Sequence, residues 1–308
     1  MEPWTEAMIP DQSGRVALIT GGNSGIGLQA ARALAEHGAH VVLACRTHAK
    51  AQAARAEILT TAPKAEVSII DLDLTSLAAV EAAAGEASAS LDRLDLLINN
   101  AGVMATPNER TVDGYELQFA TNHLGHAALT AHLLPLLLAT ERSRVVNVSS
   151  LAHRFGSIHF DDLQWDRHYR SWGAYGQSKL ANLLFTFELQ RRLAAASAST
   201  VAVAAHPGVS DTNLAGSTGG LTGKLLSVTK PVAGLFSQNS QMGALPTLRA
   251  AVDPTVRGGE YFGPDGFMEQ RGHPRLVKAN AAANDKVVAA RLWDATIELT
   301  GVPFPGLA

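Results

Sequence analysis

The sequence predicts an α/β fold: a doubly wound parallel sheet of about seven strands with helices on both faces. The first reason is alternation, because short apolar, β-branched runs take turns with longer alanine- and leucine-rich runs along the chain. The second is that the first apolar run leads directly into a glycine-rich turn and then a helical segment. No linker, repeat or low-complexity tract interrupts this order. We therefore expect one domain over residues 15–308, preceded by an N-terminal extension of residues 1–14.

The composition narrows the function. Hydrophobic residues make up 46% of the 308 residues and charged residues 17%, which allows a large core and excludes a disordered or fibrous protein. A net charge of -3 without a long basic run excludes nucleic acids and anionic membranes as expected partners. The single cysteine, Cys45, permits no internal disulfide or cysteine metal cluster and suits the cytoplasm. No apolar run approaches about 18 residues and residues 1–14 lack signal-peptide features, so we expect neither a membrane span nor a signal peptide.

The glycine turn connects a strand over residues 15–20 to a helix over residues 28–37. Gly21 permits the tight turn, Gly25 lets the backbone approach a pyrophosphate, and Gly27 lets helix and strand pack closely. The helix N-terminus then presents free N–H groups to phosphates, as in a Rossmann-type dinucleotide site, although the spacing is GxxxGxG. The candidate cofactor-binding residues of this turn are Gly21, Asn23, Ser24, Gly25, Ile26 and Gly27.

The second strand, residues 40–45, ends without the acid that NAD-binding folds place there to hold the ribose 2′-hydroxyl. Arg46 follows instead, and its planar guanidinium suits the 2′-phosphate of NADP. We expect NADP as the cofactor and NAD as the second choice. The alternative is an ordinary exposed arginine.

The third strand, residues 66–70, follows a helix over residues 51–61 and leads to Asp73 and Leu74, which are further candidate cofactor-binding residues. Asp73 can accept a hydrogen bond from the adenine amino group, and helix capping is an equally good interpretation. Thr75 or Ser76 can cap the next helix.

The fourth strand, residues 94–98, leads into small residues that let the backbone lie against a cofactor. The candidates there are Asn100, Ala101 and Gly102. The helix expected over residues 116–138 contains Asn122, His123 and His126. The two histidines have no acidic or cysteine partner at ligand spacing, so we expect no metal site.

The fifth strand, residues 144–148, ends at Ser149 and Ser150 and is followed by a polar, aromatic loop over residues 151–173. The loop contains histidines and aspartates, which leaves a catalytic His–Asp pair conceivable. A structured surface insert with capping carboxylates is the favoured interpretation.

The segment after this loop carries the strongest chemical signal. Tyr175 and Lys179 are four residues apart in a helix expected to run to about residue 193, so both point into the same space. A free tyrosine has a pKa of about 10, and a fixed cation beside it lowers that pKa, with each unit corresponding to about 1.4 kcal/mol. We therefore expect Lys179 to tune Tyr175 for proton exchange with an alcohol or carbonyl. A solvated surface pair is the alternative.

The sixth strand, residues 200–205, ends at a turn whose candidate cofactor-binding residues are Pro207, Gly208, Val209 and Thr212. Residues 206–246 form the expected substrate lid region, with residues 210–241 as its mobile part, because its apolar pieces need a surface to cover. A last strand over residues 259–262 and a closing helix over residues 281–299 complete the chain.

Together these residues resemble the short-chain dehydrogenase/reductase family over nearly the whole chain. Thr20 to Gly27 resembles its cofactor turn, Asn99 to Gly102 its NNAG segment, and Pro207-Gly208 its PG turn. Its catalytic tetrad is matched by Asn122, Ser150, Tyr175 and Lys179. The run from Tyr175 to Asn182 and the insert from Ile158 to Leu163 look most like the retinol dehydrogenase-like branch. Many animal members of that branch carry an N-terminal membrane anchor, which we do not find here, and the interval from Ser150 to Tyr175 is longer than is common in the family.

The resemblance implies reversible hydride transfer between a nicotinamide and the carbonyl or alcohol of an apolar small molecule. Tyr175 would exchange the proton, Lys179 would tune Tyr175 and hold the nicotinamide ribose, and Ser150 would bind the substrate oxygen. Asn122 would hold a water that links Lys179 to solvent. Family members often assemble through the helices of Asn122 and Tyr175, so a homo-oligomer is expected.

Simpler roles exist for each residue: Ser150 capping a strand end, Asn122 joining helix to strand, and Tyr175 and Lys179 forming a surface pair. Two other functions stay open. One is a non-catalytic NADP-binding regulator or scaffold on the same fold, against which the intact tetrad argues. The other is a C=C reductase, as in the similar protochlorophyllide reductases.

Overall fold

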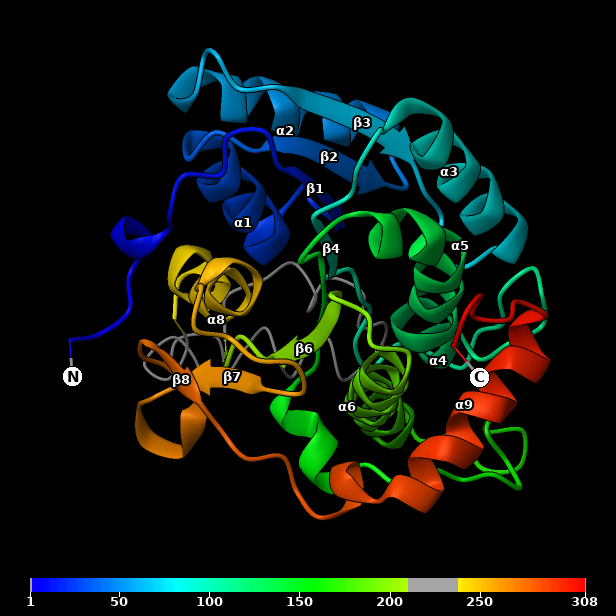
Figure 1. Ribbon diagram of the computed structural model, residues 1–308. Helices are drawn as coiled ribbons and strands as arrows, with labels where there is room; N and C mark the ends of the chain where they lie inside the picture. Colours follow the sequence, from blue (N-terminus) through cyan, green and yellow to red (C-terminus); the bar gives the residue numbers. More distant parts are fainter. Residues whose placement is uncertain (1, 210–237, 308) are drawn as a thin grey trace.

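The computed structural model describes residues 2–209 and 238–307 and contains one continuous sheet of eight strands in the order β3-β2-β1-β4-β5-β6-β7-β8. β1 to β7 are parallel and β8 runs antiparallel to β7 (Figure 1). The strands are β1 Val16–Thr20, β2 His40–Cys45, β3 Val67–Asp71, β4 Leu96–Asn99, β5 Arg144–Val148, β6 Val201–Ala205, β7 Tyr261–Pro264 and β8 Pro274–Leu276. The predicted doubly wound α/β fold is confirmed, with one strand more than expected.

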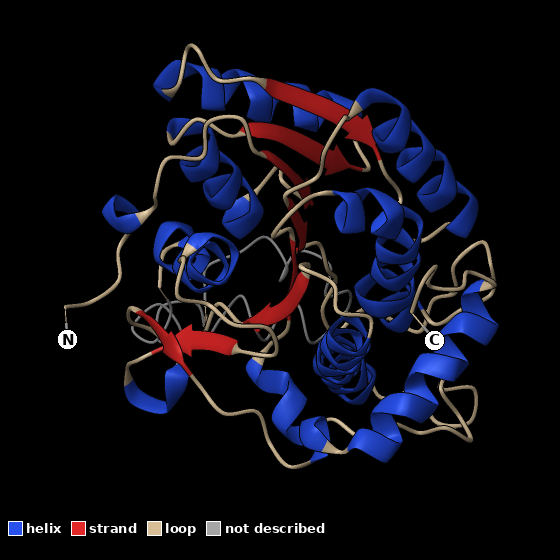
Figure 2. Cartoon of the chain, viewed as in Figure 1, coloured by secondary structure: helices blue, strands red, loops and turns tan. Residues whose placement is uncertain are grey.

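Helices cover both faces of this sheet (Figure 2). One face carries α1 Gly25–Glu36, α2 His48–Thr61 and α8 Ser240–Val252. The other carries α3 Leu77–Ser90, α5 Gly125–Ala139 and α6 Ser171–Ala195, and α9 Lys286–Thr300 packs outside α6. The short helices are η1 Glu6–Met8, α4 Leu117–Phe119, the π-helix η2 Ala120–Leu124, η3 Leu151–Phe155, η5 Phe267–Glu269 and η6 Ala282–Asn284.

The strands read as continuous apolar runs because the sheet is buried on both sides. β1 is buried at every position, and alternate side chains enter opposite core layers. Ala17 and Ile19 pack among α1 and α8, whereas Val16 and Leu18 pack toward α3 and α5. The N-terminal extension joins the first of these layers, because Trp4 is buried in it. Within the described residues, no helix is long and apolar enough to cross a membrane.

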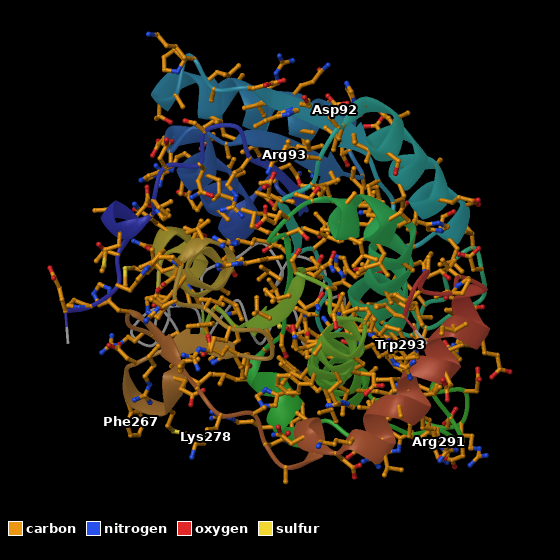
Figure 3. The ribbon with its side chains drawn as sticks, in the orientation of Figure 1. Asp92, Arg93, Phe267, Lys278, Arg291 and Trp293 are labelled. Atoms are coloured by element: carbon orange, nitrogen blue, oxygen red, sulfur yellow. The ribbon has the colours of Figure 1, made fainter. Side chains whose placement is uncertain are left out.

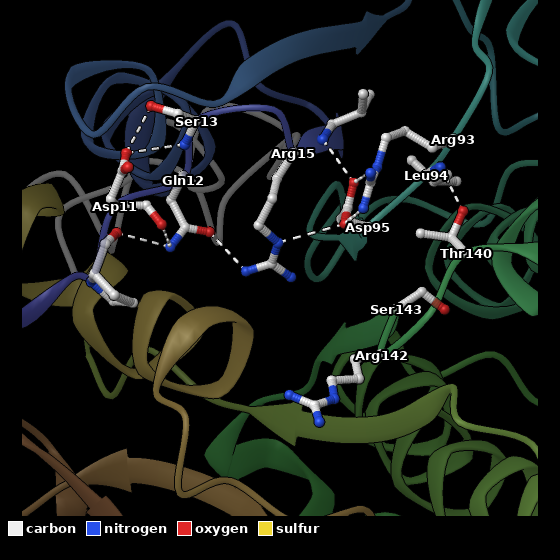
Figure 4. Close-up of polar contacts among 12 residues, drawn as sticks. Asp11, Gln12, Ser13, Arg15, Arg93, Leu94, Asp95, Thr140, Arg142 and Ser143 are labelled. Carbon is white, nitrogen blue, oxygen red and sulfur yellow. Dashed lines mark hydrogen bonds and ion pairs between the residues drawn. The ribbon is translucent and has the colours of Figure 1, made fainter.

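The amino ends of β1 and β4 are joined by a buried carboxylate (Figure 4). Asp95 accepts hydrogen bonds from the backbone N–H of Val16 at 2.9 Å and from Arg93 at 2.7 and 2.8 Å. Arg15 reaches the same carboxylate at 3.5 Å and donates to Gln12 at 2.7 Å. The cluster pairs the buried carboxylate of Asp95 with two arginines and holds the start of β1 next to β4.

The closing helix α9 covers α6. Trp293 stacks on Phe185 of α6 with ring centroids 5.5 Å apart, and Arg192 of α6 lies over the Trp293 ring. Figure 3 labels Trp293 and Arg291 on α9, and the guanidinium of Arg291 lies 4.0 Å from the centre of the Phe160 ring. α9 thereby covers one side of α6.

Several element boundaries differ from the predicted ones. α1 begins at Gly25 rather than at residue 28, α6 at Ser171 rather than at Tyr175, and α9 at Lys286 rather than at residue 281. Glycines and polar residues occupy the first turns of α1 and α6, where free backbone N–H groups tolerate them, so helix propensity underestimates these helices. The extra strand β8 has three residues and begins with Pro274, so it left no recognisable pattern.

Two longer predicted segments are also revised. The helix expected over residues 116–138 is divided into α4, the π-helix η2 and α5, and the loop over residues 151–173 contains η3 and the start of α6. The part of the predicted lid over residues 240–246 belongs to α8, where Ala244 and Leu245 pack in the core against α1. Residues 206–209 form the turn after β6, and residues 210–237 of the predicted lid lie outside the described residues.

Candidate active site

The order of the sheet reverses between β1 and β4, and ligands in such sheets bind in the crevice at the carboxyl ends of the strands. The glycine turn lies there. Gly21 and Gly25 have φ angles of 65° and 54°, which side chains other than glycine rarely adopt. A Cβ at Gly27 would lie 2.4 Å from the carbonyl oxygen of Gly21. The side chain of Ser24 makes no capping hydrogen bond, so the first turn of α1 keeps N–H groups available for an anion.

The segment after β4 is tied to this turn. The hydroxyl oxygen of Thr20 accepts hydrogen bonds from the N–H groups of Asn100 and Ala101 at 2.9 and 3.0 Å. The side chain of Asn100 donates to the carbonyl oxygen of Thr20 at 2.9 Å. Two predicted cofactor-binding segments therefore form one backbone surface.

Arg46 follows β2 with an exposed side chain that makes no hydrogen bond or ion pair within the described part of the chain. Asp71, the residue at the end of the neighbouring strand β3, is 2.8 Å from Nδ1 of His48. The carboxylate at this corner is thus engaged by a neighbour, while the guanidinium is available to an anion.

Asp73 acts as a turn residue, because its carboxylate accepts hydrogen bonds from the N–H and hydroxyl of Thr75 at 2.9 and 2.7 Å. Ser76 caps α3, as predicted, by accepting from the N–H of Ala79. The side chain of Leu74 is buried and packs against the start of α5, so it could meet a cofactor only through its backbone.

Asn122 lies in the π-helix, fully buried, with its side chain bonded on both sides. Its Oδ1 accepts from the N–H of Val103 at 2.8 Å, and its Nδ2 donates to the carbonyl of Val103 and the hydroxyl of Ser178, both at 2.9 Å. A Cβ at Gly102 would lie 3.0 Å from Oδ1 of Asn122 and 3.4 Å from Nζ of Lys179. The structure therefore brings Asn122, Gly102 and Lys179 together.

Lys179 is buried on α6, where its ammonium donates a hydrogen bond to the carbonyl oxygen of Val148 at 3.2 Å. No carboxylate of the described residues forms an ion pair with it. Burial lowers the pKa of Lys179 to about 8, so its side chain is still mostly charged at neutral pH.

Tyr175 is buried one turn before Lys179, whose Nζ lies 5.8 Å from the centre of the tyrosine ring. Burial raises the pKa of Tyr175, and a hydrogen bond from the Ser150 hydroxyl opposes this rise only partly. The predicted lowering of the Tyr175 pKa by Lys179 is therefore wrong for the protein alone. Its physical reason is that desolvation of the phenol outweighs a cation that is itself desolvated and does not contact the hydroxyl.

Ser150 ends β5 and caps η3, because its side chain accepts a hydrogen bond from the N–H of Ala152 at 3.2 Å. Ser150 therefore both caps η3 and lies next to Tyr175. The possible His–Asp pair in the following loop is absent from the described hydrogen bonds and ion pairs. His153 donates to the carbonyl of Ser150, and Asp161 pairs with Arg167, so a structured insert is the correct interpretation.

The turn after β6 is held by residues that the sequence did not reveal. Gly208 has a φ of 68°, and its N–H donates to Nδ1 of His206 at 3.2 Å. Nε2 of the buried His206 is 3.1 Å from Glu269, which also accepts from Arg154 at 2.7 Å. Arg154 and Glu269 are 115 residues apart, so only the folded chain shows that they fix the Pro207–Gly208 turn.

The other predicted residues add little. Val209 is exposed and its N–H donates to Gln270 at 2.8 Å, whereas Thr212 lies outside the described residues. Within the described residues, no three His, Cys, Asp or Glu side chains are grouped so that they could hold a metal ion. The glycine turn, the available Arg46 and the surface around Gly102 and Lys179 fit a dinucleotide, because each position is either free of a side chain or positively charged.

Known proteins share this arrangement. The family model described as short chain dehydrogenase matches residues 15–219. Retinol dehydrogenase 13 of Homo sapiens is 40% identical over 308 residues, covering 98% of this chain and 88% of that protein. Retinol dehydrogenase 12 of Mus musculus is 39% identical over 302 residues, covering 97% of this chain and 90% of that protein. A crystal structure of an uncharacterised protein from Mycobacterium paratuberculosis aligns with a TM-score of 0.82 and 41% identity, covering 99% of this chain and 100% of that one.

The match to the family spans well over half of the chain, and the relatives extend it to nearly the whole length. The predicted family is thereby confirmed: the chain belongs to the short-chain dehydrogenase/reductase family and is an NAD(P)-binding oxidoreductase.

Proposed function

We propose that the protein is an NADP(H)-dependent oxidoreductase that interconverts the carbonyl and alcohol forms of an apolar small molecule. One observation carries this proposal. Tyr175, Ser150 and Lys179 meet at the carboxyl end of the sheet, next to a glycine turn that fits a dinucleotide. No other arrangement of titratable groups among the described residues combines a buried phenol, an unpaired buried ammonium and a hydroxyl donor.

The roles follow from the chemistry of each group. In reduction the hydroxyl of Tyr175 donates its proton to the substrate oxygen, and in oxidation its phenolate accepts the alcohol proton. When bound, the nicotinamide supplies or accepts the hydride at the substrate carbon. Ser150 donates a hydrogen bond to the same substrate oxygen, and the positive charge of Lys179 stabilises the phenolate left behind. Because burial opposes phenolate formation, these two neighbours must supply the needed stabilisation.

An apolar substrate is supported by the side chains around Tyr175. Trp172, 42% exposed, lies edge-on to the Tyr175 ring with centroids 6.1 Å apart. Phe155, 58% exposed, packs against the backbone of Gly176, the next residue. Exposed aromatic side chains beside a proton donor can bury an apolar molecule. The retinol dehydrogenases that resemble the chain are named for such an alcohol.

NADP is the proposed cofactor because Arg46 is available at the end of β2, whereas the carboxylate of Asp71 at the same corner is engaged by His48. A cytoplasmic location is part of the same proposal, supported by the single, buried Cys45.

The test is a panel of aldehydes, ketones and apolar alcohols, assayed with NADPH, NADH and their oxidised forms, with Tyr175→Phe as the matched control. We expect an apolar aldehyde or ketone to be reduced faster with NADPH than with NADH, and the variant to be inactive while still binding NADPH. NADPH binding without turnover of any substrate would favour the scaffold function. A product reduced at a C=C bond would identify the other alternative.

A further inference from the structure

The buried histidine His126 has no role in the chemistry proposed above, although both of its ring nitrogens are engaged. It lies in the first turn of α5, four residues after Asn122, and is 3% exposed. Its Nδ1 is 3.0 Å from the carbonyl oxygen of Asn122, and its Nε2 is 2.8 Å from the hydroxyl of Thr20. The ring therefore connects the end of β1 to the helix that carries a residue of the tetrad.

The partners decide where the ring proton lies. A carbonyl oxygen can only accept, so Nδ1 of His126 must carry the hydrogen and donate it to Asn122. Nε2 is then an acceptor and receives the hydroxyl proton of Thr20. The Thr20 oxygen in turn accepts from the N–H groups of Asn100 and Ala101. One directed hydrogen-bond chain thus runs from the segment after β4, through Thr20 and His126, to Asn122.

Electrostatics keep this ring neutral. Burial lowers the pKa of His126 to about 4, although the hydrogen bond to Asn122 works in the opposite direction. The positive charge of Lys179 lowers the pKa of His126 further, and His126 in turn lowers that of the neighbouring His123. A protonated ring would have lost its acceptor for Thr20 and would repel the Lys179 ammonium. The chain of bonds therefore persists throughout the neutral range.

The hydrogen bond from His126 is made to a carbonyl oxygen of the π-helix η2. In a π-helix each carbonyl accepts a hydrogen bond from the residue five positions later, instead of four as in an α-helix. Such short π-helical segments are frequent at functional sites. A carbonyl oxygen has two lone pairs, so a ring that takes one of them also fixes the direction of the other. The side chain of Asn122 meanwhile holds Val103 and Ser178, and Gly102 faces both Asn122 and Lys179. A shift of the Asn122 backbone would therefore also move its side chain, which lies beside Gly102 next to Lys179.

We propose that His126 is a positioning residue: it fixes the backbone of Asn122 against Thr20, so that the Asn122 side chain keeps its place beside Gly102 and Lys179 and Lys179 can support the proton exchange of Tyr175. This inference rests on the proposed function. His126 acts through Asn122 and does not contact the substrate.

His123 is the matched control. It lies three residues earlier and is equally buried, but its Nε2 is 2.9 Å from the hydroxyl of Thr296 on α9. Its ring packs against Phe119 and Phe185, with centroids 5.2 and 5.8 Å away. Replacing His123 removes a buried histidine close to His126 but leaves the hydrogen bonds from Thr20 through His126 to Asn122 intact.

The experiment compares His126→Phe, His126→Asn and His123→Asn for kcat, the Kd of NADPH, the pH profile of kcat, the solvent deuterium isotope effect and the melting temperature. We expect His126→Phe to lower kcat about 10- to 100-fold, the range typical of residues that orient a functional group, with a changed pH profile and a larger isotope effect. NADPH affinity should change less than about threefold. His126→Asn keeps an amide donor near the Nδ1 position and should recover most of kcat, whereas His123→Asn should lower only the melting temperature.

A wild-type kcat and pH profile in His126→Phe would overturn the inference, as would losses that only parallel those of His123→Asn. A second measurement, made on the wild-type protein, requires neither enzymatic activity nor a folded variant. In the wild-type protein with ¹⁵N-labelled histidine, we expect the His126 signal of a neutral ring protonated at Nδ1 and unchanged from pH 8 to about 5. A ring protonated at Nε2 or titrating near pH 6.5 would contradict the inference even if the enzyme proved inactive on every substrate.

Discussion

Asp95 at the amino end of the parallel sheet and the pair Tyr175 and Lys179 at its carboxyl end differ in how their buried ionisable groups are held. At the amino end, burial alone would raise the pKa of Asp95, but Arg93, the N–H of Val16 and Arg15 outweigh it and hold that pKa below its ordinary value. At the carboxyl end, Lys179 and Tyr175 are buried with no ion pair, and burial shifts both pKa values toward the neutral forms. At the first site the carboxylate of Asp95 is paired with arginines and stabilises the fold. The second keeps reactive groups at a cost in stability, which is typical of functional sites.

The largest expected effect is the loss of kcat when Tyr175, at the carboxyl end of the sheet, is replaced. Tyr175→Phe removes the proton donor and should lower kcat by about 10³-fold or more, since general acid–base groups contribute about 10²- to 10⁴-fold. The ring and its packing remain, so the melting temperature and the Kd of NADPH should stay close to the wild-type values. Steady-state kinetics with calorimetry would check both. Turnover within threefold of wild type would reject the role of Tyr175.

The pH dependence of activity tests the buried charge of Lys179 at the carboxyl end of the sheet. Its lowered pKa means that the ammonium is present below about pH 8 and is lost as the pH rises through that value. We expect kcat/KM for NADPH, which reports groups of the free enzyme, to fall about tenfold per pH unit above pH 8. Lys179→Met should lack this decline and be about 100-fold slower at pH 7. A wild-type profile that is flat from pH 6 to 10 would contradict the charged, unpaired state described above.

Asp95→Asn tests the opposite end. It leaves Arg93 and Arg15 without a charged partner and should destabilise the protein by about 2 to 3 kcal/mol at pH 7, with kcat unchanged. Because the folded-state pKa of Asp95 is lowered, its contribution is present above the unfolded value of about 3.9 and is lost as the pH falls below it. Urea unfolding at pH 7 and pH 3 measures this difference.

The exposed Asp92 provides the control for that experiment. Asp92→Asn should change the free energy of unfolding by less than about 0.5 kcal/mol at either pH. If Asp95→Asn behaved in the same way, or lowered kcat as strongly as a substitution at the carboxyl end, the division of labour between the two ends would be wrong.

The smallest expected effect concerns Arg46. Arg46→Asp should shift the NADP/NAD ratio of kcat/KM toward NAD by about tenfold or more, since a hydrogen bond to a charged group contributes about 1.5 to 3 kcal/mol. Arg55→Asp makes the same charge change at an exposed position of α2 and should leave the ratio unaltered. An unchanged ratio in Arg46→Asp would show that the 2′-phosphate is recognised elsewhere.

The sequence predicted those parts of the site that depend on local spacing. The glycine turn is indicated by four glycines within seven residues, and Tyr175 and Lys179 share a face because they are four positions apart on a helix. The sheet followed from the alternation of buried strands and helices, each long enough to leave its own pattern.

The remaining features depend on contacts between distant segments. The π-helix around Asn122 is stabilised by Val103 and Ser178, and the Pro207–Gly208 turn by Glu269 and Arg154, none of which has a local signature. The direction of the Tyr175 pKa shift depends on burial by the whole fold, which a spacing of four residues cannot reveal. The connection of His126 to Thr20 spans 106 residues, so no local pattern indicates it.

A crystal structure of the protein with NADP and a carbonyl inhibitor would test the central claim most directly. We expect the hydroxyl groups of Tyr175 and Ser150 to lie within about 3.2 Å of the inhibitor oxygen, with its carbonyl carbon about 3 to 3.5 Å from C4 of the nicotinamide. A nicotinamide bound away from the ring oxygen of Tyr175, with other side chains holding the inhibitor, would contradict the account.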